Sequence, residues 1–122
     1  DHVDLSVLTD EAFASQVDRT SELLVSFGVA SSCLRPPYGR TNQHVGDLLN
    51  VRGLRLTKWS QDTEDWKLPG KTVIVERALA GAHPGAVILL HDSGPDMSET
   101  VAALPAIIEG IRARGLRLAP IC

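Results

Sequence analysis

The sequence is poor in aromatic residues and has no excess of positive charge. Phe, Trp and Tyr make up 4% of its 122 residues, and 12 Lys and Arg against 15 Asp and Glu give a net charge of −3 at pH 7. Proteins that bind nucleic acid usually carry a basic face and aromatic rings on which bases stack. Neither feature is visible in this sequence, so nucleic acid is not an expected partner.

Long apolar runs are also missing. The longest uninterrupted one is AVILL, residues 86–90. A helix that crosses a membrane needs about 20 apolar residues, so no membrane span is predicted. The hydrophobic content is nevertheless 43%, which is enough to form a buried core. The sequence therefore predicts at most one globular domain.

Cysteine is scarce as well, and the two cysteines, Cys33 and Cys122, lack the spacing of metal ligands. They could form a disulfide in an oxidising compartment or remain two separate buried thiols. A disulfide requires Cα atoms within about 7 Å of each other, which the sequence does not reveal. Both alternatives stay open at this stage.

Helical and strand-like segments alternate along the chain. In residues 9–27, Phe13, Val17 and Leu24 recur at helical spacing, and two acidic residues fall in the first turn. Further helices are predicted in residues 42–52, 72–80 and 98–114. Strands are predicted in residues 31–35, 54–60, 86–91 and 116–121, with residues 61–65 as a polar loop. This order is typical of βα units around a parallel sheet or barrel.

The most unusual short sequence is CLRPPYGR, residues 33–40. Its two prolines fix two φ angles and favour extended geometry in the residue before each of them. Arg35 therefore leaves the predicted strand in a fixed direction. A rigid surface turn would have a similar composition, so this loop needs support from the rest of the chain.

That support comes from the residues that follow the other predicted strands. Arg35, Asp62, Asp65 and His91 all lie at or just beyond the carboxyl ends of strands. In parallel α/β folds these ends gather on one face of the molecule, where binding and catalytic residues are commonly found. We therefore expect a functional site on this face.

Asp65, Trp66 and His91 are the strongest candidates within that site. A carboxylate can orient an imidazole and hold it in its charged form, while a large ring excludes water. This combination predicts general acid chemistry on a ring-shaped or acylated ligand. The alternatives are a hydrogen-bonded core histidine and a solvated acidic loop anchored by one tryptophan.

Taken in order, these motifs resemble those of the NodB-like polysaccharide deacetylases, carbohydrate esterase family 4. RPPY at residues 35–38 resembles the family's Arg-x-Pro-Tyr loop, DTEDW at residues 62–66 matches Asp-x-x-Asp-Trp, and LLH at residues 89–91 matches Leu-x-His. The resemblance implies an α/β fold, a partial (β/α) barrel of the NodB-like type whose first βα units are missing from this chain. Residues 1–122 would be the C-terminal portion of a single catalytic domain.

The resemblance also implies a reaction, the removal of acetyl groups from an N-acetylated, chitin- or peptidoglycan-like polysaccharide. His91 would protonate the leaving amine, and Asp65 would keep it charged and oriented. The backbone N–H of Tyr38 would stabilise the oxyanion, and Arg35 would orient the general base. Trp66, Leu89 and Tyr38 would contact the substrate, with the first two forming the walls of the acetyl pocket.

A divalent metal is implied too, zinc or alternatively cobalt or nickel. DHVDL at residues 1–5 resembles the tail of the family's His-Ser/Thr-x-x-His motif, which makes His2 the expected metal ligand. The family's Thr-Phe-Asp-Asp motif, which supplies the general base and another ligand, does not occur in this sequence. We therefore expect the isolated chain to be inactive and an N-terminal fragment of the same protein to complete the site.

Three alternatives remain open. A non-catalytic carbohydrate-binding barrel would keep the fold and the aromatic groove, and an acetylxylan esterase would use the same residues on an ester. The chain could also be a structural piece of a larger assembly. The resemblance implies an acetylated polysaccharide or oligosaccharide as partner and a secreted or bacterial cell-envelope location.

Overall fold

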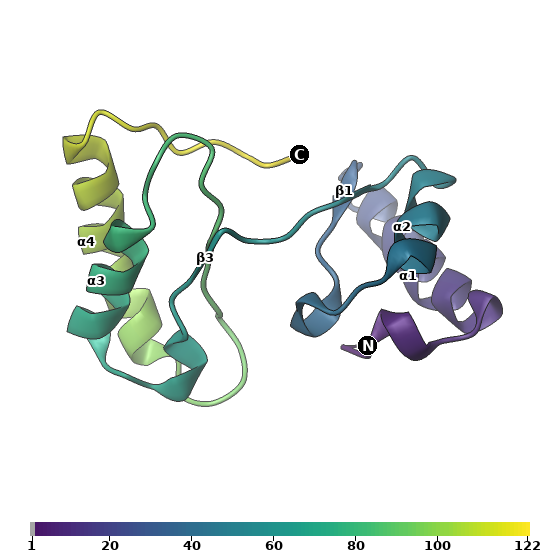
Figure 1. Cartoon of the computed structure of the whole chain (residues 1–122), viewed down its shortest axis with the longest axis horizontal. Coiled ribbons are helices and arrows are strands. Elements are labelled where there is room, and N and C mark those ends of the chain that lie inside the picture. The colour runs from purple at the N-terminus through teal and green to yellow at the C-terminus, as the bar shows by residue number, and fades with distance from the viewer. Residues whose placement is uncertain (1) are drawn as a thin grey trace. The chain divides into compact units, whose positions relative to one another are not determined.

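The computed structural model describes residues 2–122, which form two compact units. The first unit extends to Lys58 and includes Cys122, and the second is Trp59–Ile121. Figure 1 traces the chain through both. Each unit is described by itself.

The first unit contains two helices, two short parallel strands and two 3-10 turns. These are η1 (Leu5–Val7), α1 (Asp10–Ser26), β1 (Cys33–Leu34), η2 (Pro37–Gly39), α2 (Gln43–Asn50) and β2 (Arg55–Leu56). Both helices begin at a polar cap. The Thr9 hydroxyl accepts a hydrogen bond from the backbone N–H of Ala12 at 3.3 Å, and the Asn42 side chain accepts one from Val45 at 2.9 Å. These contacts satisfy backbone donors that have no partner inside the helix.

One apolar cluster stabilises the first unit. Phe13 and Val17 of α1 are buried with Val45 and Leu49 of α2. Phe13 and Val17 are two of the residues that the helical spacing places on the inner face of α1. Full burial of such side chains contributes about 1.5–3 kcal/mol each, which fixes the two helices against each other.

The second unit also contains two helices and two short parallel strands, with one 3-10 turn. It contains β3 (Gln61–Asp62), η3 (Asp65–Lys67), α3 (Lys71–Ala80), β4 (Ile88–Leu89) and α4 (Ser98–Ala113). Strands β3 and β4 are parallel, and Asp62 lies opposite Leu89. Helices α3 and α4 lie side by side and share an apolar core (Figure 1). That core consists of Ile74, Ala78, Ala103, Ile107 and Ile111.

Three predicted elements are wrong in detail. Residues 61–62, expected in a loop, form β3 because the backbone N–H of Gln61 bonds to the carbonyl of Val87 at 3.1 Å. Helix α3 begins at Lys71, before the predicted start at residue 72, and has Gly70 at its N-cap. Residues 116–121 belong to no strand within the described chain, because they are paired with no neighbouring strand there.

The other predicted strands exist but are shorter than expected. Each of the four observed strands has two residues and a single partner within the described chain. A strand is defined by its hydrogen bonds to a neighbour, so an apolar run extends beyond the part that is paired.

The prediction that residues 1–122 form one domain stays a prediction.

The two cysteines form a disulfide. Cys33 of β1 is bonded to Cys122, with the two Cα atoms 6.0 Å apart and a sequence separation of 89. This observation resolves the alternatives that the sequence left open. In the part of the chain that the structure describes, no helix is both long enough and apolar enough to cross a membrane.

Candidate active site

Asp65 and His91 form the centre of the candidate site, as predicted from their positions after strands. The Asp65 Oδ1 atom lies 2.8 Å from the His91 Nδ1 atom, and Oδ2 accepts the His91 backbone N–H at 2.7 Å. The Asp65 side chain is fully buried, whereas 31% of the His91 side chain is exposed. With Nδ1 directed at the carboxylate, Nε2 is the ring nitrogen left for an external ligand.

The loop that carries Asp65 is fixed by local hydrogen bonds. After β3, the Asp62 carboxylate accepts the backbone N–H of Glu64 at 2.8 Å. Glu64 has a φ of 50°, in the left-handed region that non-glycine residues rarely adopt. The Thr63 hydroxyl donates to the carbonyl of Leu89 at 2.8 Å and ties the loop to β4. The chain is thereby bent so that Asp65 meets the residue that follows β4 by two positions.

Arg77 of α3 holds the same loop from the other side. Its guanidinium donates to the Thr63 carbonyl at 2.9 Å and to the Glu64 carboxylate at 3.1 Å. The Lys67 ammonium also pairs with Glu64, at 2.5 Å. These contacts offset the energetic cost of the left-handed backbone conformation at Glu64.

Two effects act on the pKa of Asp65 in opposite directions. Burial raises it, because a charged carboxylate loses water. The hydrogen bonds and charge of His91, together with a hydrogen bond from the Thr100 hydroxyl at 3.1 Å, lower it. The lowering outweighs the raising, so the pKa of Asp65 lies below its ordinary value and the carboxylate is charged at neutral pH.

Thr100 contacts the Asp65 carboxylate and is a residue of the candidate site that the sequence did not reveal. It lies near the start of α4 and is 3% exposed. A threonine in a helix has no pattern that would distinguish a buried hydroxyl from an exposed one. The only available signal is that position 100 lies on the same face of α4 as the buried residues Ala103 and Ile107.

The predicted substrate-contacting residues of the second unit differ in exposure. Trp66 is 49% exposed, and the Lys67 ammonium lies 5.1 Å from its ring centre. Such a ring can stack on a sugar face. Leu89 is 7% exposed, so it offers little surface to a ligand in this structure. Their assignment to the acetyl pocket stays a prediction.

Tyr38 and His2 lie together in the first unit. The Tyr38 hydroxyl donates to the His2 carbonyl at 3.1 Å, and the two ring centres are 4.7 Å apart. Tyr38 has a φ of 57°, inside a tight turn closed by the bond from Gly39 N–H to the Pro36 carbonyl at 3.0 Å. Arg40 approaches the Tyr38 ring to 5.6 Å. The proline loop therefore holds Tyr38 in a conformation that few non-glycine residues adopt.

Arg35 follows β1 and is exposed. Arg40 anchors the other end of its loop through a 3.1 Å ion pair with Asp4, a contact that the sequence did not predict. The orienting role of Arg35 stays a prediction.

The described residues do not provide a complete metal site. Across residues 2–122, no three His, Cys, Asp or Glu side chains come together in a way that could hold a metal ion. His2, the predicted ligand, is exposed and packs on Tyr38. A catalytic zinc site usually has three protein ligands, so His2 alone does not fit one.

Comparison with known proteins finds relatives that align with nearly the whole chain. A chitooligosaccharide deacetylase from Rhizobium leguminosarum bv. trifolii is 37% identical over 130 residues, covering 96% of this chain and 60% of that protein. A peptidoglycan-N-acetylglucosamine deacetylase from Listeria monocytogenes is 30% identical over 122 residues, covering 99% of this chain and 25% of that protein. No family model matches the chain.

Solved structures share the fold. A family 4 carbohydrate esterase from Streptomyces lividans has a TM-score of 0.90 and 29% identity, covering 99% of this chain and 62% of that one. A pseudoenzyme of the same family from Bacillus anthracis has a TM-score of 0.89 and 25% identity, covering 98% of this chain and 42% of that one. The chain thus spans less than two thirds of the length of each of these relatives.

The fold is that of a carbohydrate esterase, and the predicted α/β class of the NodB-like type is confirmed. Over nearly its whole length the chain is similar to polysaccharide deacetylases and to a family 4 carbohydrate esterase, as the sequence motifs indicated. These deacetylases are those of chitooligosaccharide and of peptidoglycan.

Proposed function

We propose that this chain provides the acid–base part of a hydrolase that removes acetyl groups from an N-acetylated, chitin- or peptidoglycan-like polysaccharide. The observation that carries the proposal is the buried Asp65 carboxylate, which bonds to both the ring and the backbone of His91. Binding of a sugar alone does not require a charged carboxylate behind a partly exposed imidazole. Proton transfer to a leaving group does require such a carboxylate and imidazole.

His91 acts as the general acid. Hydrolysis of an acetamide breaks the C–N bond, and the departing amine must receive a proton because its anion is a poor leaving group. The His91 Nε2–H supplies this proton. Asp65 holds Nδ1, orients the ring and stabilises the positive charge that the ring carries before transfer.

The other predicted residues have supporting roles. The Tyr38 backbone N–H stabilises the developing oxyanion, and the fixed turn around it supports this assignment because such a donor must be aimed in advance. Arg35 orients the general base by a charge-assisted contact. Trp66 and Leu89 form the walls of the acetyl pocket, and Trp66 has the exposed ring surface that this role needs.

The described residues do not make a complete metal site. We propose that His2 is one ligand of a divalent metal, zinc or alternatively cobalt or nickel. The remaining ligands and the general base would come from an N-terminal fragment of the same protein. Alone, the chain would be inactive.

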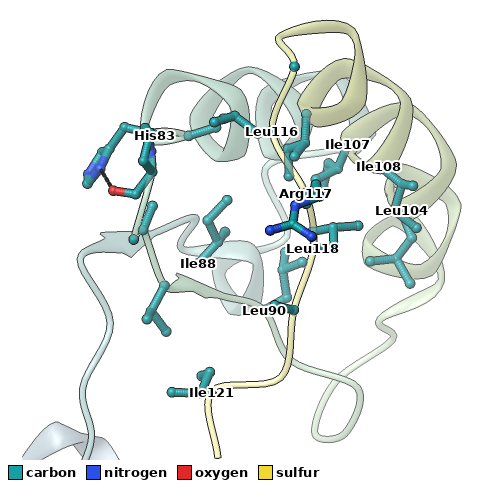
Figure 2. A pocket seen from close by; sticks show the side chains of 18 residues that line it. His83, Ile88, Leu90, Leu104, Ile107, Ile108, Leu116, Arg117, Leu118 and Ile121 are labelled. Carbon is teal, nitrogen blue, oxygen red and sulfur yellow. Dashed lines mark hydrogen bonds between the residues drawn. The ribbon is translucent and has the colours of Figure 1, made fainter.

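An apolar cavity in the second unit supports the proposal that an N-terminal fragment binds to this chain. Its volume is about 610 Å³, and Figure 2 shows Ile88, Leu90 and Leu118 among the side chains around it. The match to the Streptomyces lividans esterase leaves 38% of that structure uncovered, since it covers 62%. We propose that part of the corresponding segment in the complete protein packs against this cavity. Apolar surface of this kind is normally covered by a partner.

The experiment is to purify the chain alone and with a peptide that carries the missing family motifs. Zinc affinity and acetate release from an acetylated chito-oligosaccharide are measured for both. We expect tight zinc binding and acetate release only with the companion. A stable lone monomer with tight zinc binding and ordinary turnover would contradict the fragment proposal and the role of His2.

A non-catalytic carbohydrate-binding protein is the second candidate, because a relative with a TM-score of 0.89 is described as a pseudoenzyme. It predicts oligosaccharide binding without acetate release under every condition above. An acetylxylan esterase would instead release acetate faster from acetylated xylan than from the chito-oligosaccharide. The same assay, run on both substrates, separates these outcomes.

We propose a secreted or bacterial cell-envelope location. The disulfide supports it, because disulfides persist mainly in oxidising compartments. Labelling of free thiols in fractionated cells tests it, and a reduced Cys33 in a cytoplasmic fraction would contradict it.

A further inference from the structure

Thr100 touches the candidate acid–base pair but is not part of any of the sequence motifs. Its side chain is buried, and its hydroxyl Oγ1 atom lies 3.1 Å from the Asp65 Oδ2 atom. Helix α4, which carries it, has no side-chain hydrogen bond at its N-cap residue Met97. Thr100 lies in the first turn of this helix, where the backbone N–H of Ser98 donates to the Asp96 carboxylate at 3.0 Å.

We propose that Thr100 is a positioning residue that fixes the Asp65 carboxylate and, through it, the ring of His91. This inference rests on the proposed function, since it deepens the role of the same site. Oδ1 faces the His91 ring, while Oδ2 accepts both the His91 backbone N–H at 2.7 Å and the Thr100 hydroxyl. Donors from two separate segments keep the carboxylate from rotating about its χ2 bond.

The surroundings of Asp65 leave few other groups to take over this role. The titratable group against its carboxylate is His91, and α4 contributes the neutral Thr100. In the same loop, Glu64 is paired with Lys67 and Arg77. On α4, the Glu99 carboxylate accepts the backbone N–H of Lys71 at the start of α3, at 2.9 Å.

Two substitutions separate the hydroxyl from the rest of the side chain. Thr100→Val keeps the shape and removes the donor, while Thr100→Ser keeps the donor and removes a methyl group. Carboxyl ¹³C NMR of the 122-residue chain then follows Asp65 during an acid titration, and imidazole ¹⁵N NMR at alkaline pH, where the ring is neutral, follows the His91 tautomer. We expect the Asp65 midpoint to rise by about one pH unit in Thr100→Val, as for loss of a hydrogen bond to a charged group, and to stay near wild type in Thr100→Ser.

The His91 tautomer gives the readout for positioning. In the wild-type chain and in Thr100→Ser, the neutral ring should carry its proton on Nδ1, facing the carboxylate. In Thr100→Val the fraction of this tautomer should fall. A folded Thr100→Val chain with unchanged Asp65 midpoint and unchanged tautomer would overturn the proposal, and so would a Thr100→Ser chain that behaves like Thr100→Val.

If Thr100→Val does not fold, measurements on the wild-type chain still test the proposal. The Thr100 hydroxyl proton should be protected from exchange, and its chemical shift should change with the same midpoint as the Asp65 carboxyl. Independent behaviour of these two signals would overturn the proposal. None of these measurements needs an acetylated substrate, so their outcome is separate from whether the protein is a deacetylase.

Discussion

Asp65 combines full burial with a negative charge. A carboxylate in that position would normally take up a proton, because burial raises its pKa. The His91 ring, the His91 backbone and Thr100 reverse the direction. The charge of this one side chain therefore depends on groups contributed by two other segments of the second unit.

Replacement of His91 tests the general acid directly. In the active form of the protein, His91→Ala should lower turnover by about 10²- to 10⁴-fold, because the leaving amine loses its proton donor. Zinc affinity should change little. Acetate release and zinc titration measure the two effects.

His44→Ala serves as the matched control for this variant. His44 is an exposed histidine of α2 whose ring lies 2.6 Å from Asp10. Its loss should leave turnover near wild type. An equal loss of zinc binding and turnover in His91→Ala would make His91 a metal ligand and would contradict its role as an acid.

Asp65 also makes stability depend on pH. Its pKa is lower in the folded chain than in the unfolded chain. The resulting stability is present above the unfolded value of about 3.9 and is lost as the pH falls through the folded value. Denaturant unfolding at a series of acidic pH values, in high salt to screen exposed carboxylates, should show this loss.

Asp65→Asn provides the comparison for the acid titration. The variant should be less stable than wild type at neutral pH, and the difference between the two should shrink as the pH is lowered. Parallel stability curves over the whole acidic range would mean that the carboxylate has the same pKa in both states, contrary to this prediction.

At the scale of elements, the end of α3 and strand β3 approach each other closely. A Cβ atom added at Gly81 would lie 2.5 Å from the Cβ atom of Gln61, far inside normal contact. Gly81 has a φ of −90°, so glycine is required here by space and not by its backbone angle. This contact helps to place β3 and hence the loop that carries Asp65.

Gly81→Ala should therefore lower the free energy of unfolding by about 1–3 kcal/mol, as expected for overpacking. The control is Gly46→Ala in α2, where an added Cβ meets no atom within 4 Å. Helix propensity alone makes that change neutral or stabilising, by up to about 1 kcal/mol. Denaturant titration of both variants compares them, and equal effects would show that the close approach to Gln61 costs nothing.

The helices and strands also show which parts of the fold could be predicted from the sequence. The helices were predictable because their apolar residues repeat and their caps are polar. The Asp65–His91 contact was predictable because both residues follow strands of a parallel fold. Strand β3 was not, since the polar pair Gln61 and Asp62 becomes a strand only through its hydrogen bonds to β4. Thr100 was not either, because its partner is 35 residues away in the sequence.

At the scale of the whole molecule, the disulfide closes one long loop from β1 to the last residue of the sequence. Cys33 and Cys122 are separated by 89 residues. A crosslink over a loop of this length restricts the unfolded chain and stabilises the folded one, by about 4–5 kcal/mol in the chain-entropy model. Reduction should lower the midpoint of thermal unfolding, which can be followed by circular dichroism with and without dithiothreitol.

The double variant Cys33→Ala and Cys122→Ala separates the crosslink from the reductant. It should unfold at the midpoint of the reduced wild-type chain and should not respond to dithiothreitol. If the oxidised and reduced proteins unfold at the same temperature, the crosslink contributes no net stability.

The contacts that hold Asp65 and His91 all come from the second unit, whereas His2 and Tyr38 lie in the first. Mutations in one unit therefore need not disturb the local structure of the predicted chemical groups in the other. A variant that loses the predicted metal ligand His2 should therefore keep the Asp65–His91 contact of the second unit intact.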